Sequence, residues 1–164
     1  MNAPEFDEAI AHKYFAPRLN GECWNLLDKE ERTEEEDRRM LMAAFASCYH
    51  WLHVRNNLNQ QRGEWLIARA FAALGDGENC LKHALRCMEW TEKADDSYKD
   101  FDFAYAHEML ARGYALTGQT EKAAELRAKA KELGDQLADD EDRKYFLSDL
   151  AWGEWPGLAD EDSI

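Results

Sequence analysis

The sequence predicts an all-α fold, a stack of antiparallel helix pairs with about 7–8 helices. Apolar residues recur with a helical period along most of the chain, and the β-branched alternation of strands is nearly absent. The 164 residues include only 3 Pro and 9 Gly, few for a turn-rich β protein. The length fits one domain, expected over residues 1–152, with an acidic, flexible tail over 153–164.

The first third of the chain predicts three helices. Helices over about 5–15 and 20–28 are separated by Pro17, because an internal proline removes a hydrogen bond and clashes with the preceding turn. A long helix over about 34–56 begins at a capping box formed by Thr33 and Glu36. Its apolar side chains share one face: Leu41, Ala44, Phe45, Cys48, Trp51 and Leu52.

Two helix pairs and a last helix follow. They are expected over about 60–74, 78–95, 101–117, 120–136 and 140–152. Gly75 and Gly118 stand where the first helix of each pair ends in a left-handed residue. Asp76 and Thr120 are expected to cap the second helices, and Asp139 the last helix. Connections this short force neighbouring helices to run antiparallel.

The two pairs are internally repeated. When Gly75 is aligned with Gly118, 43 residues later, small, basic and aromatic residues coincide. The matched residues are Ala68 with Ala111, Arg69 with Arg112, Phe71 with Tyr114, Cys80 with Ala123, and Cys87 with Ala130. The repeat predicts two copies of one helix pair, in close contact at the small positions.

The second copy, with Leu110-Ala111, Tyr114, Gly118, Ala123 and Ala130, resembles the tetratricopeptide repeat (TPR). The resemblance covers about residues 61–134. The chain departs from the family in its period of 43 rather than about 34 residues. It also has Glu64 and His107 where the family has tryptophan, and it lacks the closing proline. The resemblance implies a right-handed α–α superhelix whose first helices line a concave groove for an extended or helical peptide.

Carried onto this chain, the groove residues are Arg62, Trp65, Arg69, Tyr105, Glu108 and Arg112. Arg69 and Arg112 are basic points on an acidic protein and suit an acidic or carboxylate-terminated peptide. The alternative is that Glu108 pairs with both arginines and satisfies the groove internally. Two placements stay open for Trp152, Trp155 and Leu158, which stand among acidic residues: docking back onto these arginines, or docking into the groove of a neighbouring molecule.

A second candidate surface is the corner containing His50, Trp51 and Asn59, because tryptophan and polar side chains concentrate in binding hot spots. The alternative is that Trp51 and Trp65 pack between helices while the amides hold the turn.

Two groups of residues carry metal-ligating side chains. His50 and His53 lie one helical turn apart, and Cys80, His83 and Cys87 share a helix face that suits zinc. Because Cys80 and Cys87 occupy small positions of the repeat, we expect no metal and no other cofactor.

The net charge of −14 argues against nucleic acid and anionic membranes as partners. The longest apolar run, 40–46, is far shorter than the roughly 20 residues of a membrane span. No secretory signal is visible near the N-terminus, so a cytoplasmic protein with reduced, buried cysteines is expected.

P-loop, GxGxxG, GxSxG and HExxH motifs are absent, which predicts a protein that is not an enzyme. The predicted function is protein or peptide binding through the concave groove. The alternative is a small-molecule-binding or sensor domain whose polar pocket contains Arg69, Glu108, Arg112 and His50. Homodimerisation through exposed aromatic residues is a further expectation.

Overall fold

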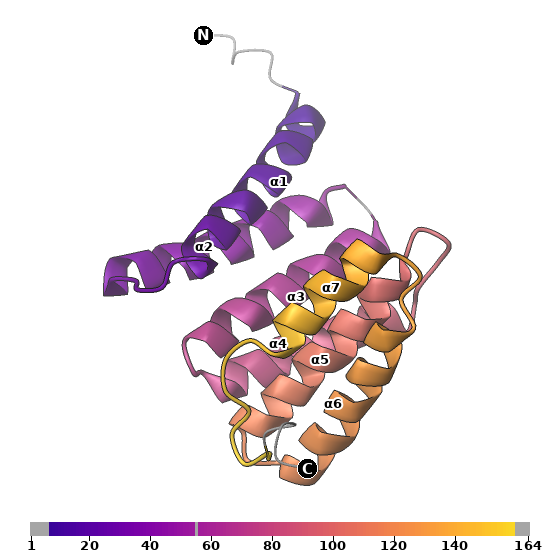
Figure 1. Ribbon diagram of the computed structural model, residues 1–164. Helices are drawn as coiled ribbons and strands as arrows, with labels where there is room; N and C mark the ends of the chain where they lie inside the picture. Colours follow the sequence, from indigo (N-terminus) through magenta and orange to yellow (C-terminus); the bar gives the residue numbers. More distant parts are fainter. Residues whose placement is uncertain (1–6, 55, 160–164) are drawn as a thin grey trace, which may run out of the picture.

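In the computed structural model, which describes residues 7–54 and 56–159, the chain forms seven α-helices and no strand (Figure 1). They are α1 (Glu8–Leu27), α2 (Glu34–Leu52), α3 (Asn57–Ala73), α4 (Gly77–Thr91), α5 (Asp100–Leu116), α6 (Thr120–Asp135) and α7 (Asp140–Leu150). The all-α stack predicted from the sequence is confirmed. The expected helix start at residue 5, residue 55 and the tail beyond 159 lie outside the described residues.

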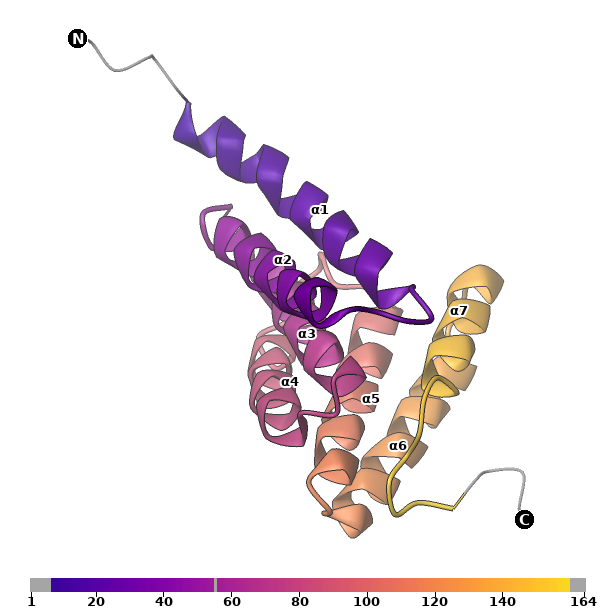
Figure 2. The same cartoon turned by 90° about the vertical axis from the view of Figure 1, so that its left-hand side faces the viewer.

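The helices pack in a regular order. α1 packs on α2, α3 on α4 and α5 on α6, and the second helix of each pair packs on the first helix of the next. The odd-numbered helices also contact one another in sequence, α1 with α3, α3 with α5 and α5 with α7. Figure 2 shows α1 and α2 at one end of this stack and α6 and α7 at the other. The odd-numbered helices therefore form an inner layer, and α2, α4 and α6 form an outer layer.

Two turns of identical design join the repeated helix pairs. Gly75 and Gly118 have φ angles of 71° and 76°, the left-handed region that glycine adopts without a Cβ clash. The amide after each glycine donates to the carbonyl of Phe71 (3.0 Å) or Tyr114 (2.8 Å), closing a Schellman motif. The expected left-handed glycines are confirmed. The predicted cap at Thr120 is wrong, because the helix begins with that residue and the cap is Gln119.

Small residues set the distance between neighbouring pairs. Cys80, Cys87, Ala123 and Ala130, the small positions of the repeat, are all 0% exposed. A Cβ added to Gly113 of α5 would lie 2.7 Å from Cα of Leu81 in α4. Close backbone approach thus explains why these positions hold cysteine, alanine and glycine.

The first helix corrects the sequence-based prediction, because α1 runs without a break through Pro17. Contacts with α2 lie on both sides of the proline. The Ser47 hydroxyl donates to the Ala16 carbonyl (2.8 Å), and Arg39 pairs with Glu22 at 2.6 Å. This packing outweighs a proline cost of about 3 kcal/mol.

Helix ends differ in smaller ways from the predicted ranges. α2 ends at Leu52 and α4 at Thr91, each four residues before the predicted end. The capping box at Thr33 and the caps at Asp76 and Asp139 are confirmed. No helix in the described part of the chain combines the length and apolarity needed to cross a bilayer.

Candidate functional site

The inner layer of the stack holds a cleft of about 470 Å³. α1, α2, α3, α5 and α7 all contribute to its lining. The lining includes five residues singled out from the sequence: Trp51, Asn59, Arg62, Trp65 and Tyr105. The structure thus joins part of the predicted groove and part of the second candidate surface into one concavity.

Aromatic rings form one wall of the cleft. Trp65 is 7% exposed, and its indole N–H donates to the Tyr105 carbonyl (3.1 Å). Its ring stacks on Trp24 with centroids 5.8 Å apart and meets the Tyr105 ring edge-on at 5.3 Å. Trp24 and Trp51 are only half-buried, so their rings remain open to a ligand. Trp65 is a fixed part of the cleft that positions the more exposed ring of Trp24.

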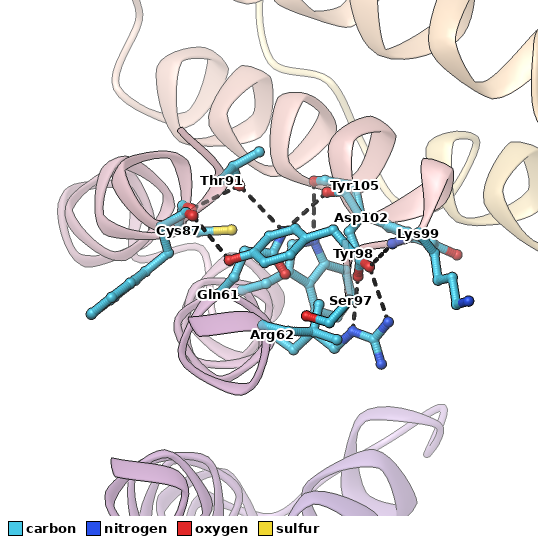
Figure 3. A network of polar contacts seen from close by, with 12 residues as sticks. Gln61, Arg62, Cys87, Thr91, Ser97, Tyr98, Lys99, Asp102 and Tyr105 are labelled. Carbon is cyan, nitrogen blue, oxygen red and sulfur yellow. Dashed lines mark hydrogen bonds and ion pairs between the residues drawn. The ribbon is translucent and has the colours of Figure 1, made fainter. Parts of the chain in front are cut away.

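A charged pair also lines the cleft. Arg62 of α3 donates two hydrogen bonds to Asp102 of α5, at 2.8 and 3.0 Å. Figure 3 shows Arg62 and the backbone nitrogen of Lys99 converging on the Asp102 carboxylate. Gln61 donates to the backbone carbonyl of Asp102 (3.0 Å). The network holds Arg62 in one orientation while 43% of its side chain stays exposed.

The other predicted groove residues form a buried charge cluster. Arg69, Glu108 and Arg112 are 4%, 0% and 3% exposed. Nε of Arg112 donates to Glu108, and Nη1 of Arg69 lies 3.9 Å from the same carboxylate oxygen. Burial lowers the pKa of Arg69, and the charge of Glu108 opposes that shift. The structure therefore has the internally paired arrangement, with both arginines beside Glu108, rather than two accessible cations.

Asp149 of α7 links this cluster to the cleft. One of its oxygens lies 3.7 Å from Nη2 of Arg69, and the other accepts a 2.6 Å hydrogen bond from the Tyr105 hydroxyl. Burial raises the pKa of Tyr105, so the phenol keeps its proton and remains the donor.

The described part of the expected tail does not extend away from the domain. The Trp152 ring lies 3.6 Å from the Arg69 guanidinium, and the Trp155 ring lies 4.2 Å from that of Arg112. The Trp155 indole N–H also donates to the Leu150 carbonyl (3.0 Å). Both tryptophans thus cover these arginines, which is the first of the two placements left open by the sequence.

His50 lies apart from the cleft. Its Nδ1 is 2.8 Å from Nδ1 of His12, between α1 and α2, and the His53 ring stacks on His12 at 3.8 Å. Burial, with the charges of these two histidines, lowers the pKa of His50. The structure does not bring His50 to Arg69, Glu108 and Arg112, the pocket proposed for a small molecule.

The cysteines are buried free thiols. Burial raises the pKa of Cys80 to about 12, so its sulfur stays protonated near neutral pH. His83, between Cys80 and Cys87 in the sequence, instead pairs with Glu64 at 2.6 Å. Among the described residues, no group of three His, Cys, Asp or Glu side chains is placed to hold a metal ion.

The lining residues that sequence reasoning missed include Trp24, Phe101, Asp102 and Asp149. Phe101 precedes Tyr105 by one helical turn, so extending the groove face by four residues would have found it. Trp24 and Asp149 lie outside the repeat and carry no comparable signal. Comparison of the chain with protein-family models, curated proteins and solved structures finds no match.

Proposed function

We propose that this chain is a non-catalytic, TPR-like module that binds a peptide or protein segment in the inner-layer cleft. The observation that carries the proposal is the length of the concavity. The 470 Å³ cleft adjoins a second cleft of about 510 Å³, and the two share Trp24 and Asp149. A concavity that continues from one cleft into the next suits an extended ligand better than a compact one.

The lining suits side chains of a peptide. Trp24, Trp51 and Phe101 offer half-buried aromatic surface, and Arg62 lies 5.2 Å from the Phe101 ring. Tryptophan and arginine dominate the energetics of protein recognition surfaces. Because Asp102 already orders Arg62, binding does not have to immobilise that long side chain. The expected ligand is an apolar or aromatic peptide whose carboxylate, side-chain or terminal, contacts Arg62.

A small molecule is the second candidate function. The volume of the first cleft falls within the range of about 300–1,000 Å³ typical of ligand pockets. The two functions differ in what occupies the second cleft: a peptide extends past Trp24 and Asp149, whereas a small molecule stays between Trp51 and Phe101.

Selection from a random-peptide library on the immobilised whole chain tests the proposal. The selected peptides should lose binding to a Trp51→Ala, Phe101→Ala variant. They should bind a Tyr145→Ala variant normally, because Tyr145 is 64% exposed on α7 and does not line either cleft. Failure to select any peptide, or equal binding to both variants, would refute peptide binding in the cleft.

A further inference from the structure

The segment after α7 makes a regular pattern of contacts with the domain. Trp152, Trp155 and Leu158 are half-buried, whereas the four residues between them are exposed. Gly153 and Gly157 have φ angles of 66° and 76° and turn the chain between the anchors. Apolar anchors at every third position, 152, 155 and 158, give the segment the form of a short linear motif bound to a surface.

The surface beneath the two tryptophans is built from guanidinium groups. The Trp152 ring lies 3.6 Å from Arg69 and 5.0 Å from Arg112, and the Trp155 ring lies 4.2 Å from Arg112 and 4.7 Å from Arg127. Arg69 and Arg112 occupy equivalent positions of the two repeats, so the duplication itself sets the pair side by side. We call Arg69, Arg112 and Arg127 the arginine face. Indole rings over guanidinium groups are a favourable cation–π arrangement.

The attachment of the segment is mostly through side chains. Its backbone hydrogen bonds run to α7 or within the segment: Ala151 to Leu147, Trp152 to Asp149 and Leu158 to Trp155. Toward α6, Arg127 donates to the Ala159 carbonyl (3.3 Å). Release of the two indoles therefore frees the segment without breaking a strand or helix ladder.

The arginine face also has unused capacity. Clefts of about 510 and 320 Å³ lie on either side of Trp152, which lines both together with Ala73. Nη1 of Arg69 is buried and makes no hydrogen bond within the described part of the chain. Moving Trp152 aside would join the two clefts over the guanidinium groups of Arg69 and Arg112.

We propose that the arginine face is a second recognition surface, for a partner peptide carrying two tryptophans three residues apart with an acidic residue between them. Residues 152–158, with Glu154 between Trp152 and Trp155, occupy that surface in cis and compete with the partner. Glu154 lines the 320 Å³ cleft together with Arg112, so the acidic residue of the motif lies near a guanidinium group. This surface meets the proposed peptide site at the 510 Å³ cleft, which Arg69 and Trp152 line. Trp51 and Phe101 line only the 470 Å³ cleft, so a substitution at Trp51 separates the two proposals.

The test uses a labelled synthetic peptide of residues 151–159, blocked at both ends, and the full-length chain with Trp152→Ala and Trp155→Ala. Fluorescence anisotropy should show this variant binding the peptide at least about tenfold more tightly than the wild type, whose own segment competes at high effective concentration. A Trp90→Ala variant is the matched control, because Trp90 also contacts a cation, Lys93 at 4.8 Å, but on α4. It should bind as the wild type does.

Two further arms locate the binding. Adding Arg127→Gln to the double variant should weaken peptide binding several-fold, whereas adding Trp51→Ala in the cleft should leave it unchanged. A peptide with both tryptophans replaced by alanine should not bind. The proposal would be overturned if the wild type and the double variant bound the peptide equally well. It would also be overturned if adding Trp51→Ala to the double variant abolished peptide binding.

A measurement on the wild type covers the case in which the double variant does not fold. In the chain labelled with ¹⁵N-tryptophan, excess unlabelled peptide should move the indole signals of Trp152 and Trp155 toward those of exposed tryptophan. The signal of Trp90 should stay in place. Unmoved Trp152 and Trp155 signals at millimolar peptide would contradict competition for the arginine face.

Discussion

Replacing Gly113 by alanine tests whether close helix contact at small residues holds the repeated pairs together. The added Cβ would lie 2.7 Å from Cα and 3.0 Å from Cβ of Leu81. Favourable carbon–carbon contacts are about 3.5–4.0 Å long, so α4 and α5 would have to separate by about 1 Å at this point. The contact is with backbone, which a rotamer change cannot relieve.

The magnitude follows from two opposing effects. Overpacking a close contact costs about 1–3 kcal/mol, and alanine gains back about 1 kcal/mol of helix propensity over glycine. We expect Gly113→Ala to lower the free energy of unfolding by up to about 2 kcal/mol. Gly21→Ala in α1 is the matched control, because a Cβ there has no neighbour within 4 Å. It should raise the free energy of unfolding by about 0.5–1 kcal/mol.

Urea unfolding followed by far-ultraviolet circular dichroism measures both changes. The two substitutions are chemically identical and both lie inside helices, so helix propensity alone predicts the same sign for both. If Gly113→Ala stabilises the chain as Gly21→Ala does, the close packing of α4 on α5 is refuted.

Three further predictions concern ionisable groups. Glu108→Gln removes the carboxylate that two buried arginines share and should lower the free energy of unfolding by about 3–5 kcal/mol. A decrease below about 1 kcal/mol, measured by urea unfolding, would contradict the pairing. The pKa of His50 is lowered in the folded state, so the folded state binds fewer protons than the unfolded state. The free energy of unfolding should therefore fall as the pH drops through about 6.5. His50→Asn should reduce that fall, measured as the shift of the urea midpoint with pH. Burial raises the pKa of Cys80 to about 12 in the folded state, so above about pH 9 the thiol ionises more readily in the unfolded chain. The free energy of unfolding should therefore decline above about pH 9. Thiol labelling that is faster in the native than in the urea-unfolded chain would contradict this burial.

Local signals in the sequence predicted the helix pairs well. The capping box at Thr33, the caps at Asp76 and Asp139, and the left-handed glycines at 75 and 118 depend on a few neighbouring residues and are confirmed. The break at Pro17 was wrong because packing against α2 decides the conformation there.

The candidate site could be predicted only in part. Arg62, Trp65 and Tyr105 were found because they lie on equivalent faces of the repeated helices. Trp24 and Asp149 reach the cleft from helices outside the repeat, so no spacing in the sequence connects them. The sequence was compatible with exposed and with paired arginines at 69 and 112. The positions of Glu108, which pairs with both arginines, and of Trp152, which covers them, decide between the two, and both positions depend on the folded structure.

The indole resonances offer the most direct measurement of where a selected peptide binds. In the wild-type chain labelled with ¹⁵N-tryptophan, titration with that peptide should shift the indole signals of Trp24 and Trp51 and leave that of Trp90 unchanged. Unchanged signals of Trp24 and Trp51 at saturation, with shifts confined to Trp90 or to Trp152 and Trp155, would contradict binding in the inner-layer cleft.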